Sequence, residues 1–189
     1  MRPTRQGCWV ADFRLETERL AMRSWRDEDR APFAALCADP KVMATLGPVM
    51  SRAEADVVVD RAIAREQEHG HTSWALERLA DRTLIGWCGV IRGHTGPVAD
   101  KAELGWRLAS DYWGQGYAIE AARASLVWTF ANLPDDAAWA ITSRGNVRSR
   151  SVMERLGLRY RPECDFAHPR IADGDPLQPH VAYCLERSV

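Results

Sequence analysis

The sequence lacks any apolar run long enough to cross a bilayer, since a membrane-spanning helix needs about 20 mostly apolar residues in succession. Residues 1–12 include arginines but no apolar core like that of a signal peptide. The chain also contains no internal repeat and no low-complexity segment. These absences argue against an integral membrane protein and predict a location in the cytoplasm, without membrane contact.

The chain also lacks the residue spacings that hold metal ions or disulfides. Its five histidines include no H-E-x-x-H pair, and its five cysteines are odd in number with no C-x-x-C pair. We therefore expect reduced thiols and no metal site. Cys88 has apolar neighbours such as Trp87 and Val90. It is expected to pack in the core rather than to act as an acyl-cysteine nucleophile.

Lysine is scarce as well, at positions 41 and 101 only, so arginine supplies nearly all of the positive charge. The formal net charge of −1 and the isoelectric point near 6.5 give no bulk attraction to nucleic acid or to an anionic membrane. With 46% hydrophobic and 27% charged residues, the composition is that of a globular protein. A chain of 189 residues can form one core. We expect a flexible extension over residues 1–12 and a single domain over residues 13–189.

Periodicity and capping signals predict an α/β (α+β) order of strands and helices. The first helix is expected near residues 27–37, with Pro40 ending it. A capping box at Ser51–Glu54 opens the second helix, which Gly70 ends. Two more helices are expected, one after Gly116 and one over residues 146–156. Strands are expected at 15–25, 72–79, 83–91, 102–108, 137–142, 158–166 and 181–186.

The most informative segment is a strand, Glu103–Leu108, that leads through a short loop into Gly114, Gly116 and a helix. The first amide groups of a helix have no intrahelical partners and lie at the positive end of its dipole, and glycine lets a phosphate approach the backbone. No lysine follows these glycines and no third glycine completes G-x-G-x-x-G, so neither a Walker loop nor a dinucleotide fingerprint is present. By itself, the pattern fits either an anion site or a tight turn without ligand.

Two motifs resemble those of the GNAT superfamily of N-acetyltransferases. Trp113–Ala118, preceded by Tyr112, resembles the coenzyme A pyrophosphate loop, in the form typical of the branch that acetylates ribosomal-protein amino termini (the RimJ/RimL type). Asn146–Leu158 resembles the family's Asn-x-x-Ser-x-x-Val-x-Glu-Lys-Leu-Gly-Phe signature. With Leu15–Leu20 and His180–Tyr183, the resemblance spans residues 15–187.

The resemblance implies a mixed central sheet of about seven strands flanked by four helices, in which strands 102–108 and 137–142 splay apart. It implies acetyl-coenzyme A as cosubstrate, with the pantetheine arm paired to the backbone near Trp106–Leu108. Arg148 and Arg150 are candidates for the 3′-phosphate, and Trp25, Trp74 or Trp106 for an acceptor pocket. The expected cofactor-binding residues are Trp106, Arg107, Leu108, Trp113, Gly114, Gln115, Gly116, Tyr117, Ala118, Asn146 and Ser149.

The implied reaction is direct attack of a primary amine on the thioester in a ternary complex. Glu103 is the first candidate for the base, because its strand borders the cleft; an ion pair or a solvated carboxylate is the competing interpretation. Many family members have a tyrosine acid seven residues after the asparagine, but here that position is Met153, which cannot donate a proton. The branch suggests Ser149 in its place, and a helix-cap or surface hydroxyl is the competing interpretation for that residue.

The nature of the acceptor stays open, as a protein amino terminus or a small-molecule amine. Two other functions compete: an acyltransferase that prefers another donor such as succinyl-coenzyme A, and a coenzyme A-binding module without turnover. Arginines near the thioester would favour the succinyl donor. The exposed sheet edges also offer a surface for a homodimer.

Overall fold

The computed structural model describes residues 12–187, which fold around one mixed sheet of nine strands. The sheet order is β1-β2-β3-β4-β5-β6-β9-β7, with β8 paired to β9. Only β5 and β6 are parallel among the described pairs. Residues 1–11 of the predicted N-terminal extension lie outside the described residues. The strands are β1 Arg14–Glu16, β2 Leu20–Arg23, β3 Ser73–Arg78, β4 Thr83–Arg92, β5 Ala102–Leu108, β6 Ala137–Ser143, β7 Arg159–Tyr160, β8 Phe166–Ala167 and β9 Pro179–Glu186.

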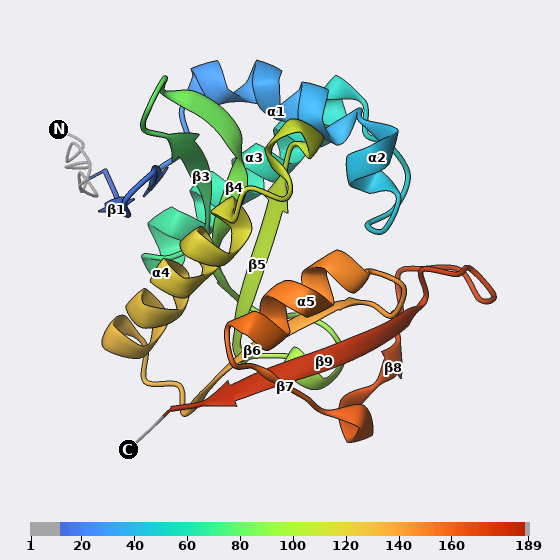
Figure 1. The fold of residues 1–189 in the computed structure, drawn as a ribbon. Coiled ribbons are helices and arrows are strands. Elements are labelled where there is room, and N and C mark those ends of the chain that lie inside the picture. The colour runs from blue at the N-terminus through green and yellow to red at the C-terminus, as the bar shows by residue number, and fades with distance from the viewer. Residues whose placement is uncertain (1–11, 188–189) are drawn as a thin grey trace, which may run out of the picture.

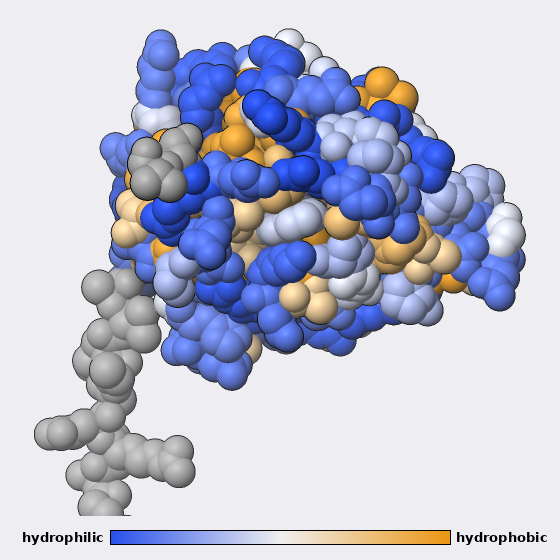
Figure 2. Space-filling view, turned by 90° about the horizontal axis from the view of Figure 1, so that it is seen from below, coloured by the Kyte–Doolittle hydropathy of each residue, from blue (hydrophilic) through white to orange (hydrophobic). Residues whose placement is uncertain are grey.

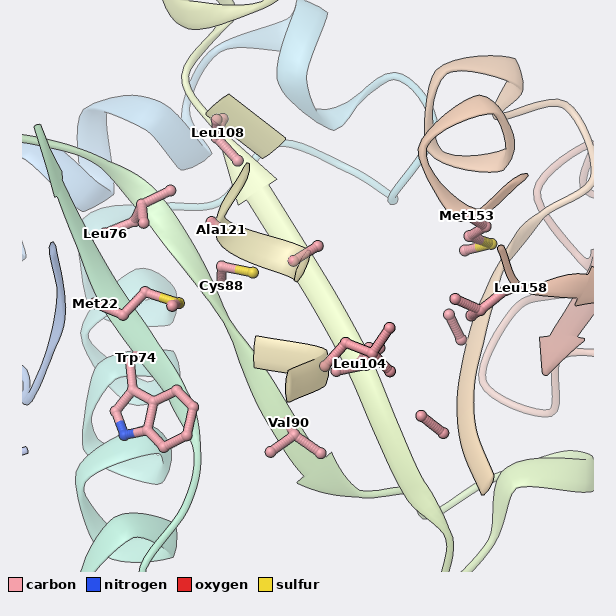
Figure 3. Packing of buried hydrophobic residues seen from close by; sticks show 14 of the residues in the cluster. Met22, Trp74, Leu76, Cys88, Val90, Leu104, Leu108, Ala121, Met153 and Leu158 are labelled. Atoms are coloured by element: carbon pink, nitrogen blue, oxygen red, sulfur yellow. The ribbon is translucent and has the colours of Figure 1, made fainter. Parts of the chain in front are cut away.

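Helices cover both faces of the sheet (Figure 1). On one face α4 and α5 pack against a large apolar cluster to which β4 and β5 contribute Cys88, Val90 and Leu104. Figure 3 shows these side chains together with Met153 and Leu158 from the α5 side. On the other face α1, α2 and α3 enclose a second cluster around Phe33. The helices are α1 Arg30–Cys37, α2 Pro40–Met43, α3 Arg52–His69, α4 Tyr117–Asn132 and α5 Val147–Arg155.

The structure confirms the fold class and the element order, and it corrects some details. The described residues form nine strands and five α-helices, rather than about seven and four. Pro40 does not only end the first helix: it begins α2, where its missing N–H costs nothing. The expected strand 15–25 is divided into β1 and β2, which pair with each other as a hairpin. The expected strand 158–166 is interrupted by a 3-10 turn at Pro162–Cys164.

The parallel strands β5 and β6 stay paired over two positions only. Ala102 pairs with Ala138 and Glu103 with Trp139, and no later pair is formed. Figure 1 shows the two strands starting together and running apart. Asp135 fixes the joined end, because its carboxylate accepts hydrogen bonds from Arg92 (2.6 and 2.7 Å) and from the backbone N–H of Ala102 (3.0 Å). The predicted splay between these strands is therefore present.

The face in Figure 2 is mainly hydrophilic, and its hydrophobic residues gather in small separate groups. Within residues 12–187, no helix combines the length and the apolar character that a bilayer crossing requires.

Candidate active site

A cavity of about 480 Å³ lies beside the last residues of β5, between the N-termini of α4 and α5. Another wall comes from α2 and the segment after it, through Lys41, Val42, Ala44, Thr45 and Leu46. Ten of the eleven residues predicted to bind the cofactor line this cavity: Trp106, Arg107, Leu108, Trp113, Gly114, Gly116, Tyr117, Ala118, Asn146 and Ser149. The two sequence motifs, about 30 residues apart, thus meet at one place because β5 and β6 diverge there.

The glycine loop presents unpaired amide groups to the cavity. Gly114 and Gly116 have φ angles of +73° and +84°, in the left-handed region that glycine adopts without strain. Gly116 is the N-cap of α4 and provides no side-chain cap. The first N–H groups of this 16-residue helix therefore lack partners from a capping side chain. With the positive end of the helix dipole, they form a site for an anion.

The charges on the cavity wall are all of one sign. Four cationic side chains line it, and no Asp or Glu among the described residues does. This is a local excess, because the whole chain has a net charge of −1. The cavity therefore suits a ligand with several negative charges. The four cations are Lys41, Arg107, Arg148 and Arg155.

The two arginines considered for the 3′-phosphate have different surroundings. Arg148 lies on the cavity wall, with its guanidinium carbon 4.7 Å from the centroid of the Trp113 ring. Arg150 does not line the cavity: its Nε donates to the hydroxyl of Tyr183 (3.0 Å). Only Arg148 of this pair is placed to meet a ligand.

Gln115 is the predicted cofactor residue that does not line the cavity, and the prediction for it concerns its backbone N–H rather than its side chain. Its side-chain amide donates to the backbone carbonyl of Asp111 (2.9 Å). The backbone carbonyl of Gln115 accepts a hydrogen bond from Arg19 (3.0 Å). Arg19 also donates to the Glu120 carboxylate on α4 (2.7 Å) and lies over the Tyr117 ring at 4.6 Å. Gln115 therefore helps to hold the loop in place. The sequence around Arg19 contributes to the family resemblance, but it contains no signal for the contact between Arg19 and the glycine loop.

Asn146 has a structural role that is visible at the start of α5. Its Oδ1 accepts a hydrogen bond from the N–H of Ser149 (3.1 Å), and its Nδ2 donates to the Thr142 hydroxyl (3.0 Å). Asn146 is thus the N-cap of the helix. Ser149 is half-buried and lines the cavity one turn later. The cap is Asn146 rather than Ser149, so the Ser149 hydroxyl is not needed for capping.

Glu103 lies at the joined end of β5 and β6, outside the 480 Å³ cavity. Its Oε2 is buried and has no hydrogen-bond partner among the described residues. Burial raises the pKa of this carboxyl to about 7, and the positive charge of Arg65 on α3 opposes this shift. Glu103 as a residue is half-buried and forms no hydrogen bond through Oε2 among the described residues, so the base and the partly solvated carboxylate are the two interpretations that stay predictions. Glu103 can take up a proton near neutral pH.

The remaining candidates lie in the core. Cys88 is fully buried, which raises the pKa of its thiol to about 12, so it is no nucleophile at neutral pH. Trp74 is also fully buried and Trp25 nearly so. Trp74 has no exposed surface with which to line a pocket, whereas Trp106, the third candidate, lines the cavity.

Comparison with known proteins agrees with this geometry. A family described as the acetyltransferase (GNAT) domain matches residues 19–159. The uncharacterized protein YkkB of Bacillus subtilis is 30% identical over 151 residues, which cover 79% of this chain and 87% of that protein. An acetyltransferase from Agrobacterium tumefaciens has a similar structure, with a TM-score of 0.76, 26% identity, and coverage of 97% of this chain and 100% of its own. RimL, a ribosomal alpha-N-protein acetyltransferase solved in complex with coenzyme A, has the same fold at 15% identity, with a TM-score of 0.72 and coverage of 90% and 95%.

Proposed function

This chain belongs to the GNAT family of acetyl-coenzyme A-dependent N-acetyltransferases, and from that premise we propose that it passes the acetyl group directly to a primary amine in a ternary complex. The observation that carries the proposal is the cavity beside β5, which combines the N-terminus of α4 with four cations and no described acid. Coenzyme A is a polyanion with a pyrophosphate and a 3′-phosphate, so its charges match this wall.

The residues of the cavity suggest how the cosubstrate is held. The N–H groups after Gly116 bind the pyrophosphate, while Lys41, Arg148 and Arg155 supply positive charge around it. The backbone of β5 near Trp106 is free to pair with the pantetheine arm, because β6 has already left this part of β5. The thioester then lies in the gap between the two strands, toward Glu103.

Glu103 is the proposed base. Successive side chains of a strand point to opposite faces, so Glu103 lies on the face covered by α3, whereas Leu104 packs toward α4. An amine approaching from the α3 face would meet the base first and the thioester behind it. Since a side-chain amine is protonated at neutral pH, Glu103 must accept its proton before the nitrogen can attack.

The bonds made and broken then balance. The amine nitrogen forms a C–N bond to the acetyl carbon, the C–S bond breaks, and the sulfur leaves as a thiolate. One proton of the amine passes to Glu103, directly or through a water. Ser149, which lines the cavity, polarises the departing sulfur, and the second proton that the nitrogen loses as the amide forms passes to this sulfur through Ser149 and a water. Acetyl-coenzyme A is available in the cytoplasm, and a cytoplasmic location of this protein stays a prediction.

Calorimetric titration with acetyl-coenzyme A, then with succinyl-coenzyme A on the same preparation, tests the proposal. We expect tight binding of the acetyl form, followed by thiol release when peptide amino termini or small amines are added. Binding without release for any amine would favour the coenzyme A-binding module. Binding of neither thioester would contradict the proposed function.

A further inference from the structure

Three unpartnered polar atoms, one of them on the proposed base, belong to the neighbouring strands β4 and β5. Among the described residues, five buried side-chain nitrogen or oxygen atoms have no hydrogen-bond partner, and three of these are on adjacent strands. They are Trp87 Nε1 on β4, and Glu103 Oε2 and Arg107 Nε on β5. Buried polar groups without partners are rare in folded proteins and call for a specific explanation.

The strand register places these atoms on one face of the sheet. Trp87 pairs with Arg107 across the two strands, and Ile91 pairs with Glu103. The residues between Arg107 and Glu103 include Gly105, which has no side chain on this face. The indole of Trp87 occupies that space, since a Cβ on Gly105 would lie 3.1 Å from its ring atoms. The Trp87 ring thus lies on β5 between the positions of Arg107 and Glu103, on the face of the sheet opposite α4.

The charge on Arg107 is not neutralised by any described residue. Its one hydrogen bond goes from Nη1 to the Cys37 sulfur (3.3 Å) on α1, and thiol sulfur is a weak acceptor. No described carboxylate lies within salt-bridge distance of it. Arg107 as a whole is half-buried, but its Nε is shielded from water, and shielding a charged donor is costly unless a partner is supplied.

Arg23 shows how this fold satisfies an arginine that is buried as a whole. Its guanidinium donates to both oxygens of Asp29 (2.7 and 2.8 Å) and to Glu77 (2.8 Å). Two carboxylates thus pair with Arg23, whereas no described carboxylate pairs with Arg107. The missing partner of Arg107 is best explained by a ligand, because Arg107 also lines the cavity beside β5.

We propose that Arg107 and the indole N–H of Trp87 form a carboxylate-binding subsite, so that one of the two reactants carries a carboxylate. A guanidinium binds a planar carboxylate through parallel hydrogen bonds, and the indole adds a neutral donor. Glu103 and Arg107 are four residues apart on β5, which is about 13 Å between their Cα atoms. That distance leaves room for a chain of several bonds between the reacting centre and the carboxylate.

This inference rests on the proposed transferase function, and the carboxylate has two possible sources. It belongs either to the acyl group, as in succinyl-coenzyme A, or to the amine, as in an amino acid. The phosphates of the cosubstrate are not the source, because the N-terminus of α4 and the other three cations are already available for them.

Matched pairs of probes distinguish the two sources by binding alone. The first arm titrates succinyl-coenzyme A against butyryl-coenzyme A, which has the same chain length without the carboxylate. The second arm titrates amino acids into the protein–coenzyme A complex, each against the amine that lacks its carboxylate, for example L-phenylalanine and 2-phenylethylamine. We expect the carboxylate form to bind about 10- to 100-fold tighter in one arm, as for a charge-assisted hydrogen bond.

The variant Arg107→Met should abolish that preference, and Trp87→Phe should reduce it by a smaller factor. Arg159→Met, at an exposed arginine of β7, is the matched control and should keep the preference in full. The absence of a carboxylate preference in both arms, or a preference that survives in Arg107→Met, would overturn the proposal.

Thermal unfolding separates a ligand-binding role from a structural one. If Arg107 serves a ligand, Arg107→Met should unfold at the same temperature or higher, because it removes a guanidinium whose buried Nε has no partner in the fold. A clear decrease in Tm would mean that the guanidinium stabilises the fold, and it would contradict the inference. If the unmodified protein binds acetyl-coenzyme A but shows no carboxylate preference, only this inference fails; if it binds no thioester, the proposed function fails as well.

Discussion

Arg19 and Glu120 form an ion pair across 101 residues of sequence, with 2.6 Å between Arg19 Nη2 and Glu120 Oε2. The same carboxylate accepts a hydrogen bond from the hydroxyl of Thr17 (2.6 Å). Although burial opposes it, the hydrogen bonds from Thr17 and Arg19 hold the pKa of Glu120 below its usual range. Since Arg19 also binds the carbonyl of Gln115, this contact ties the start of the sheet to the glycine loop.

We expect Arg19→Met to weaken coenzyme A binding more than it weakens the fold. The loop would lose its hydrogen bond at Gln115, and a loss of about 1 kcal/mol in binding free energy raises Kd about fivefold. The exposed ion pair itself contributes no more than about 1 kcal/mol to stability. Calorimetric titration gives the Kd, and thermal unfolding gives the stability. Arg14→Met removes another exposed pair, with Glu16 on β1, and equal Kd values for the two variants would refute a role for Arg19 in the loop.

Gly116→Val should destroy most of the coenzyme A affinity. The φ of +84° is strained for valine, and its Cβ would lie 3.3 Å from the Arg19 guanidinium, so the loop must move. Gly174 has nearly the same φ, +82°, in a loop that does not line the cavity, so Gly174→Val is a matched control for strain. Both variants should lose about 1–2 kcal/mol of stability. Only Gly116→Val should raise Kd, by tenfold or more; a similar Kd in both variants would argue against the loop as the phosphate site.

Glu103→Gln should lower kcat by about 10²- to 10⁴-fold, the usual contribution of a general base. Coenzyme A affinity should stay within about twofold of the unmodified protein, since Glu103 lies outside the cavity. Because the base acts in its unprotonated form and burial places its pKa at about 7, kcat/KM should rise with pH below 7 and level off above it. The exposed Glu163 provides the control Glu163→Gln. A pH profile that is unchanged in Glu103→Gln would exclude Glu103 as the base.

The same substitution should stabilise the protein at alkaline pH. Burial raises the pKa of Glu103 from its ordinary value of 4.5 to about 7 in the fold, so between these values the folded chain binds more protons than the unfolded chain. Glu103 therefore costs stability as pH rises through this window, by about 3 kcal/mol at most. The Tm gain of Glu103→Gln should be larger at about pH 8 than at about pH 5. A gain that does not depend on pH would mean that the carboxyl group ionises freely in the fold.

Much of the fold follows from local signals in the sequence. The capping box at Ser51 and Glu54 and the stop at Gly70 predict α3, and both features are present in the structure. Pro40 shows the limit of such signals: proline is equally compatible with the end of one helix and the first turn of the next. The difference was decided by the Asp39 carboxylate, which caps the N-terminus of α2.

The candidate site was predicted where it depends on backbone conformation and missed where it depends on distant contacts. Gly114 and Gly116 are recognisable because left-handed φ angles favour glycine at any such turn. Gln115 stands between them, and its side chain donates to Asp111 while its backbone carbonyl accepts from Arg19. Its neighbours in sequence do not show which way a side chain points at the start of a helix, and Arg19 comes from the far end of the sheet.

The sequence by itself determined the order of strands and helices, the glycine loop and the family, because each depends on residues close together in the chain. Only the tertiary structure decided the electrostatics of the site. Whether a carboxyl such as Glu103 titrates near pH 4 or near pH 7 depends on what lies against it, and here Gly93 approaches its Oε2 while the charge of Arg65 comes from α3. The partner of Arg107 likewise depends on the tertiary structure, because α1 places the Cys37 sulfur, and no carboxylate, against its guanidinium. Desolvation is a property of the assembled layers, which no short stretch of sequence encodes.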